Sequence, residues 1–186
     1  MKILGYVVVA IVGIGIGWFI CHEKCEHKVD GLILSAGPMY IESKIPGPDK
    51  KVIAYDGGNF VLLPKIVPPV PPTGNPNEGW LIQTETVNSM TQTVIVLASN
   101  TSVYLGRDLD DKTLLQCDNT NEHRGWQLQK SNVLGAPTIL FVSPGSNVGD
   151  FRALCVINGK LNLSNGPMPP NAPNDPSYNW TTTIYP

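Results

Sequence analysis

The feature that most constrains the fold is a unit that occurs three times along the chain and ends each time in a tryptophan. These tryptophans are Trp80, Trp126 and Trp180, and the first two follow a glycine directly. Ahead of each one the chain shows the same order of segments: two apolar runs, a turn, a short third run and a polar loop. Repetition of one small unit predicts an architecture in which the copies bury a shared core.

The apolar runs have the length and the β-branched content that are typical of strands. Between the second and third runs lie turns at 56–59, 107–111 and 158–159, whose Gly, Asn and Asp residues favour tight hairpins. The predicted first strands lie at 39–41, 94–97 and 139–142, the second at 52–55, 103–105 and 153–156, and the third at 60–63, 113–115 and 161–163.

Four short strands in each of three units are the number that a β-trefoil needs. We therefore predict an all-β domain of this kind over residues 29–186, in which 32–34 pair with 183–185 to close the ring. The alternative is an irregular sandwich whose tryptophans are spaced by chance. Composition agrees with a loop-rich β protein, because 18 glycines and 17 prolines break helices and supply turns. The formal net charge of -2 gives no electrostatic reason to expect nucleic acid as a partner.

Two stretches resemble the repeats of ricin-B-type trefoil proteins. The sequences KTLLQCDN at 112–119 and RGWQL at 124–128 are similar to the second half of such a repeat, and ALCVINGKLNL at 153–163 is similar to the first half. The resemblance covers residues from about 38 to 186 and implies a β-trefoil with sugar-binding capacity. In that family two cysteines bridge within one repeat, whereas Cys117 and Cys155 lie in different repeats, and the Gln-x-Trp signature is absent.

The N-terminal segment is continuously apolar. From Ile3 to Ile20 it carries no charge, and a helix of that length, at ~1.5 Å per residue, spans roughly the hydrocarbon core of a bilayer. We expect residues 1–28 to form a retained signal-anchor and its juxtamembrane segment, which makes the chain a single-pass membrane protein. The alternative is a cleaved signal peptide, but only Lys2 precedes the run and no small-residue cleavage site follows it.

Gly13 and Gly17 form a Gly-x-x-x-Gly spacing, which lets another membrane helix approach closely. The alternative is that glycine is simply common in membrane helices. Lysines flank the apolar run on both sides, so charge leaves the orientation in the membrane open.

After the anchor, the ligand types of a zinc site crowd together. They are Cys21, His22, Cys25 and His27. A tetrahedral site normally draws its ligand pairs from two separated elements, so we expect no metal here and no cofactor elsewhere. The other readings are a helix end at the headgroup level, an acylated cysteine or an intermolecular disulfide.

Two proline-rich segments, 64–76 and 167–176, precede the first and third tryptophans at the same point of the repeat. Proline restricts the backbone, so these segments are expected to form stiff, extended arms. Their apolar residues predict docking on neighbouring protein subunits; the alternative is that the arms cover their own barrel. The predicted partner-contact residues are Ile66, Val67, Pro68, Pro69, Val70, Pro71, Pro72, Met168, Pro169 and Pro170.

Three N-glycosylation sequons begin at Asn100, Asn162 and Asn179. In a chain this rich in Asn and Thr they are close to chance, and the last two lie inside predicted strands, which argues against their use.

The sequence gives little support for catalysis. The predicted β domain contains one histidine, His123, and shows no serine elbow, paired metal motif or phosphate-binding glycine loop. We therefore expect a non-enzymatic protein.

An anchor, a β domain and stiff arms predict a tether between a lipid bilayer and a protein assembly. The architecture looks like that of a minor capsid protein of a large icosahedral DNA virus with an internal membrane, which would place the chain in the virion. The alternative is a membrane-anchored lectin with a shallow sugar site, where an aspartate meets an aromatic residue. The candidate pairs are Tyr55 with Asp56 and Tyr104 with Asp108.

Overall fold

A computed structural model of the chain describes residues 27–29, 32–34, 37–65, 75–87, 89–108, 113–133, 135–144 and 151–185, with side chains from residue 37 onward. The described chain is all-β apart from three single-turn 3-10 helices. Among those residues, none of the helices is both long and apolar enough to cross a bilayer. The predicted anchor, with Gly13 and Gly17, lies outside the described residues.

Each of the three repeat units forms four strands, and every predicted strand overlaps an observed one. The first unit comprises β3 (Met39–Ser43), β4 (Lys51–Asp56), β5 (Asn59–Pro64) and β6 (Trp80–Val87). The second comprises β7 (Met90–Leu97), β8 (Tyr104–Arg107), β9 (Leu114–Cys117) and β10 (Gly125–Val133). The third comprises β11 (Ala136–Val142), β12 (Leu154–Ile157), β13 (Lys160–Leu163) and β14 (Trp180–Ile184).

Short elements complete the described chain. Before the repeats, β1 (His27–Val29) and β2 (Leu32–Leu34) form a separate antiparallel pair. The 3-10 helices precede the second and third tryptophans, and they are η1 (Glu122–Arg124), η2 (Ala172–Asn174) and η3 (Pro176–Tyr178).

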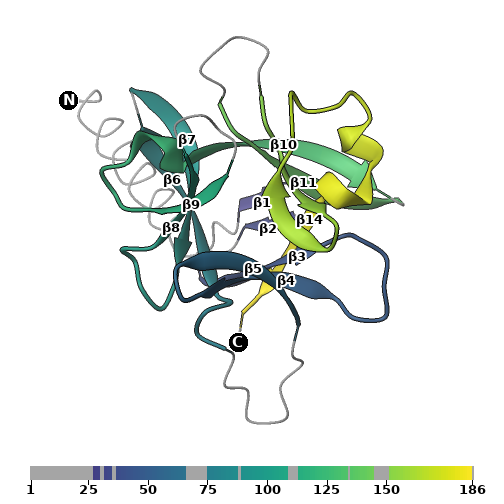
Figure 1. Ribbon diagram of the computed structural model, residues 1–186, viewed down its shortest axis with the longest axis horizontal. Helices are drawn as coiled ribbons and strands as arrows, with labels where there is room; N and C mark the ends of the chain where they lie inside the picture. The colour runs from purple at the N-terminus through teal and green to yellow at the C-terminus, as the bar shows by residue number, and fades with distance from the viewer. Residues whose placement is uncertain are drawn as a thin grey trace, which may run out of the picture.

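The first and last strands of the units pair in a closed antiparallel cycle. Its order is β3, β14, β11, β10, β7 and β6, and β6 returns to β3. The two middle strands of each unit form a hairpin, namely β4–β5, β8–β9 and β12–β13. Figure 1 shows the three units arranged around a common centre.

The three units are related residue by residue. Each tryptophan lies opposite the first strand of its own unit, at Met39, Thr93 and Ile139 in turn. Each fully buried indole also donates a hydrogen bond to a carbonyl oxygen of the hairpin in the same unit. The three bonds are Trp80 Nε1 to Ile53 (2.8 Å), Trp126 Nε1 to Leu105 (2.7 Å) and Trp180 Nε1 to Leu154 (3.1 Å).

The hydrophobic core lies inside the cycle of strands. One residue from the first strand of each unit, Ile41, Ile95 and Phe141, packs there with the three tryptophans. All of these side chains are buried, and each contributes roughly 1.5–3 kcal/mol of burial free energy or more. A unit alone has no partner for this face, which explains why the repeat occurs three times.

The predicted pairing of 32–34 with 183–185 is wrong. Residues Leu32–Leu34 pair with β1, whereas β14 pairs with β3 in a register that places Ile184 opposite Met39. The first strand of the first unit already offers β14 a complete partner, so no additional strand is needed to close the cycle.

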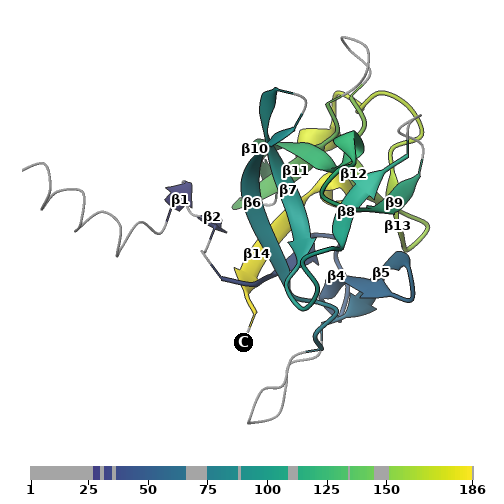
Figure 2. The same cartoon turned by 90° about the vertical axis from the view of Figure 1, so that its left-hand side faces the viewer.

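The hairpins and the N-terminal strands lie at opposite ends of the domain. In Figure 2 the hairpins β4–β5, β8–β9 and β12–β13 stand on the right, whereas β1 and β2 lie on the left beside the end of β14. Any ligand site between the hairpins therefore faces away from the N-terminal side.

Candidate functional site

A groove of about 520 Å³ separates the first hairpin from the third. One wall is β5, with Phe60, Val61 and Leu62; the other runs from Gly159 to Asn162, at the turn and start of β13. Its volume lies in the range of small-molecule sites in proteins. The two walls are about 100 residues apart in sequence, and the repeat architecture brings them together.

Tight turns fix the shape of both hairpins. At the tip of β4–β5, Gly57 and Gly58 have φ values of 54° and 98°; at the tip of β12–β13, Asn158 and Gly159 have 51° and 74°. Positive φ at both central residues is the geometry of a two-residue hairpin turn, and Gly and Asn tolerate it best. The predicted turn sequences at these two tips are therefore confirmed, and they hold the groove walls on short, rigid hairpins.

An aromatic stack supports the groove from the first hairpin. The rings of Tyr55 and Phe60, which are cross-strand partners, have centroids 5.7 Å apart, and Phe60 lies 5.9 Å from the ring of Trp80. The Tyr55 hydroxyl donates a hydrogen bond to Gln116 Oε1 in the second hairpin. Phe60 is thus a half-buried ring, held by the core on one side and lining the groove on the other.

The chemistry of the groove is mixed. Phe60, Leu62 and Leu161 supply apolar surface, while Asn162 supplies an amide that can both donate and accept hydrogen bonds. Lys160 adds an ammonium group at the exposed rim. An aromatic face beside a few polar groups suits a ligand that has one apolar face and a polar edge.

Of the predicted sugar-site residues, one pair lies beside the groove. Tyr55 packs on Phe60, and Asp56 is exposed at the hairpin tip, where it lies opposite Asn59. Sequence reasoning did not identify Phe60 or Asn162 as site residues. The predicted pairs are near neighbours in sequence, within one repeat, whereas the groove joins two different repeats.

The structure does not bring Tyr104 and Asp108 together in an open site. Tyr104 is buried in a satellite apolar cluster, and burial, followed by the nearby Glu85 carboxylate, raises the pKa of its phenol. At the other end of β8, Asp108 accepts hydrogen bonds from the backbone and hydroxyl of Thr113 (3.2 and 2.8 Å). Tyr104 is therefore a buried core residue, and Asp108 closes the β8–β9 hairpin.

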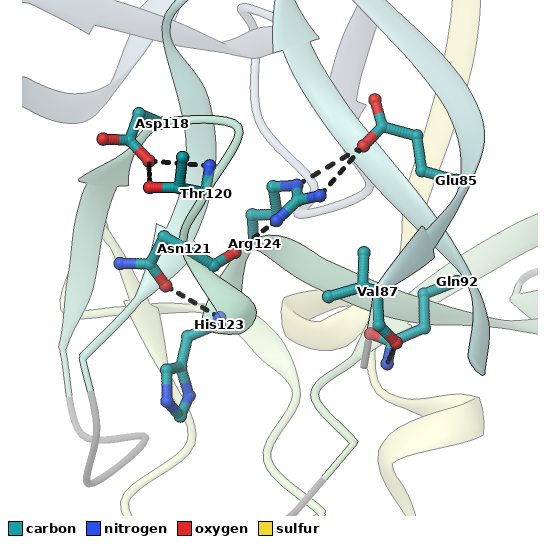
Figure 3. Close-up of polar contacts among 8 residues, drawn as sticks. All are labelled: Glu85, Val87, Gln92, Asp118, Thr120, Asn121, His123 and Arg124. Carbon is teal, nitrogen blue, oxygen red and sulfur yellow. Dashed lines mark hydrogen bonds and ion pairs between the residues drawn. The ribbon is translucent and has the colours of Figure 1, made fainter. Parts of the chain in front are cut away.

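Figure 3 shows the polar network that covers this part of the second unit. The Arg124 guanidinium donates to Glu85 Oε2 (3.3 and 3.4 Å) and to the carbonyl of Asn121 (2.6 Å). Asn121 accepts a hydrogen bond from the backbone of His123 (2.8 Å), and so caps η1. The network joins η1 to β6, and His123 therefore lies in a 3-10 turn that is held by structural hydrogen bonds.

A partly buried ion pair occupies the outer face of the first unit. Lys65 Nζ donates to the carboxylate of Glu42 and to Thr183 Oγ1 (2.9 Å), and it lies 4.5 Å from the centroid of the Tyr40 ring. Burial tends to raise the pKa of Glu42, but hydrogen bonds from Lys65 and Thr183 and the charges of Lys65 and Lys50 outweigh it. The net effect holds this pKa below its usual value.

The third-unit arm packs on its own domain. Met168 and Ala172 contact Leu140 and Val142 on the outer face of β11, which agrees with the alternative that such arms cover their own barrel. Pro169 is half-buried and Pro170 exposed, and their contact with a partner stays a prediction. The first-unit arm residues Ile66, Val67, Pro68, Pro69, Val70, Pro71 and Pro72 lie outside the described residues.

The described residues contain no group of three or more His, Cys, Asp or Glu side chains arranged to hold a metal ion. Cys21, His22 and Cys25 lie outside them, and His27 is described only as a backbone position in β1. Cys117 and Cys155 are buried free thiols. Burial, followed by the charge of Asp175, raises the pKa of Cys155 to about 12, so this thiol is not nucleophilic at neutral pH.

A second cavity, of about 350 Å³, lies beside the β3–β4 loop. It contains no aromatic ring; its lining residues are Ser43, Ile45, Pro46, Gly47, Pro48, Asp49 and Lys51. Of these two cavities the groove between the hairpins is the better candidate, because an aromatic face and an amide meet there on two hairpins.

Comparison with solved structures shows a likeness in fold. No family model and no curated protein matches the chain. Among solved structures, the chain is similar to the GlcNAcα1-4Gal-releasing endo-β-galactosidase from Clostridium perfringens, with a TM-score of 0.54 and 15% identity. The match covers 83% of this chain and 34% of the enzyme chain, so this chain spans about a third of the enzyme's length. At that identity the likeness concerns the fold alone.

Proposed function

We propose that the described domain is a β-trefoil that binds carbohydrate without catalysing a reaction, and that the N-terminal segment holds it at a membrane. The trefoil assignment is supported by the closed cycle of six strands, by the three hairpins and by the three equivalent indole hydrogen bonds.

The observation that carries the carbohydrate proposal is the groove with Phe60 on one wall and Asn162 on the other. The C–H groups on one face of a pyranose ring pack against an aromatic face, while its hydroxyl edge needs donors and acceptors such as a side-chain amide. The structural likeness to a galactosidase, a carbohydrate-active protein by name, adds support at the level of the fold.

The tether between a bilayer and a protein assembly stays a prediction from the sequence, as does its place in a virion. The anchor and the predicted partner-contact residues of the first-unit arm lie outside the described residues. Carbohydrate binding by the β domain depends on neither element. Only the proposed membrane attachment depends on the anchor.

The experiment is a glycan array probed with the full chain in lipid nanodiscs. The decisive variant is Phe60→Leu, because the equivalent positions of the other two hairpins are Leu114 and Leu161, which shows that leucine fits there. Loss of the ring is expected to weaken binding about two- to tenfold, since stacking contributes about 0.5–1.5 kcal/mol beyond area burial.

The matched control is Leu115→Ala, an exposed position (46%) on the second hairpin that does not line the groove. It should bind as the parent does. If no saccharide binds the parent chain, or if Phe60→Leu binds as tightly as the parent, the proposal fails.

A further inference from the structure

We propose that Asn100 is an N-glycosylation site and that the β domain therefore faces the lumenal or extracellular side of the membrane. The proposal rests on how the structure sorts the three sequons, and it is independent of sugar binding in the groove.

Asn179 is excluded as an acceptor by burial. Its side chain is fully buried, and its amide nitrogen donates to the carbonyls of Ala172 and Asp175, both at 2.8 Å. Its amide oxygen accepts a hydrogen bond from the hydroxyl of Thr138 (2.7 Å). An enzyme that needs the amide nitrogen would have to unfold the loop before β14.

Asn162 is a strand residue. It lies in β13 opposite Cys155, and its half-buried side chain lines the groove beside the first hairpin. A transferase active site would have to separate the β12–β13 pair to reach an extended acceptor segment.

Asn100 has the opposite surroundings. It lies with Thr101 and Ser102 in the turn between β7 and β8, and all three residues are exposed. Its backbone closes the turn through hydrogen bonds with Leu97 (3.1 Å) and Val103 (3.0 Å). Its Oδ1 accepts from the backbone N–H of Ser102 (3.1 Å), whereas Nδ2 donates no hydrogen bond within the described part of the chain.

This arrangement presents the group that reacts. In N-glycosylation the Asn Nδ2 forms a bond to the anomeric carbon of an oligosaccharide carried on a lipid pyrophosphate. The bond from that carbon to the pyrophosphate oxygen breaks, the lipid pyrophosphate leaves, and the amide loses one proton to a base of the transferase. A free Nδ2 on an exposed turn meets this requirement without loss of structure.

The modification also determines the orientation of the membrane anchor, which the flanking lysines leave open. The transferase acts only on the lumenal side, so a glycan at Asn100 requires that the β domain is translocated. The turn shares no residue with the groove, so a glycan there leaves the lining of the groove unmodified.

The test is cell-free translation of the full chain with endoplasmic-reticulum microsomes, followed by N-glycosidase treatment and gel electrophoresis. The expected result is one slower band that the glycosidase removes and that Asn100→Gln abolishes. A positive control is Pro167→Thr, which makes an exposed sequon at Asn165 in the bend after β13 and should add a second glycan.

Each other outcome overturns the proposal. If the parent chain shows no shift while Pro167→Thr gains one, the domain is translocated but Asn100 is not an acceptor. If neither is modified, the domain is not lumenal. A shift that persists in Asn100→Gln assigns the glycan to another asparagine.

Discussion

Replacement of each repeat tryptophan by phenylalanine tests whether the three units are equivalent. Each change keeps an aromatic ring in the core and removes one indole N–H, which leaves a hairpin carbonyl without its hydrogen-bond donor. The bonds run from Trp80, Trp126 and Trp180 to equivalent carbonyls, at 2.8, 2.7 and 3.1 Å.

The magnitude follows from the fully buried state of all three side chains. A buried carbonyl left unpaired costs about 1–3 kcal/mol, and the space left by the smaller ring adds about 1 kcal/mol. Each variant should therefore lose about 2–4 kcal/mol of unfolding free energy. Trp126→Phe should lie at the upper end, because the Arg107 guanidinium lies 5.4 Å from the indole ring centroid, and tryptophan is the best cation–π partner.

The assay is urea unfolding of the full chain in nanodiscs, followed by far-UV circular dichroism and linear extrapolation. Leu115→Ala, at an exposed position, serves as the control and should change the unfolding free energy by less than about 0.5 kcal/mol. The reasoning is refuted if one tryptophan variant is as stable as the parent while the other two lose several kcal/mol.

Three further predictions concern single buried groups. A Cβ on Gly106 would lie 2.2 Å from Cys117 Sγ, so Gly106→Ala should lower the urea midpoint strongly. Addition of Cys117→Ala to this variant should restore part of the midpoint. An unchanged midpoint for Gly106→Ala contradicts the packing. The lowered pKa of Glu42 means that its ion pair with Lys65 stabilises the fold above the pKa of an unfolded glutamate and loses this effect as pH falls through the folded value. Glu42→Gln should therefore flatten the acid limb of stability against pH, and an acid limb as steep as the parent's would refute this role. In a Cys21→Ser/Cys25→Ser background, Cys155 and Cys117 should react with a thiol reagent at pH 8 only after addition of denaturant. The reason is that both thiols are buried and that burial raises both of their pKa values. Rapid labelling of the native protein would show that the thiols are accessible.

What the sequence predicts well is local. The tryptophan strands, the apolar runs and the turns at Gly57-Gly58 and Asn158-Gly159 each depend on a few neighbouring residues, and their threefold repetition identifies the topology of the unit. The indole hydrogen bonds explain why a tryptophan closes every unit: only its ring both fills the core and donates to a hairpin carbonyl.

What the sequence does not predict is contact between repeats. Phe60 and Asn162 form one groove only because the third hairpin folds beside the first, and no local pattern marks that neighbour. The contact of Met168 with the outer face of β11 is not predicted for the same reason, since an apolar arm can pack on its own barrel as well as on a partner. Leu32–Leu34 has the composition of a strand, but it pairs with β1, and β3 takes the place beside β14.

The most direct test of the carbohydrate site is a methyl NMR titration of the full chain in nanodiscs with the saccharide that binds most strongly on the array. We predict that the methyl signals of Val61, Leu62 and Leu161, which line the groove, shift with saturation. The signals of Ile45, at the second cavity, and Leu115, on the second hairpin, should stay in place. Shifts centred on Ile45, or no shift in the groove at a saturating concentration, would contradict a carbohydrate site between the first and third hairpins.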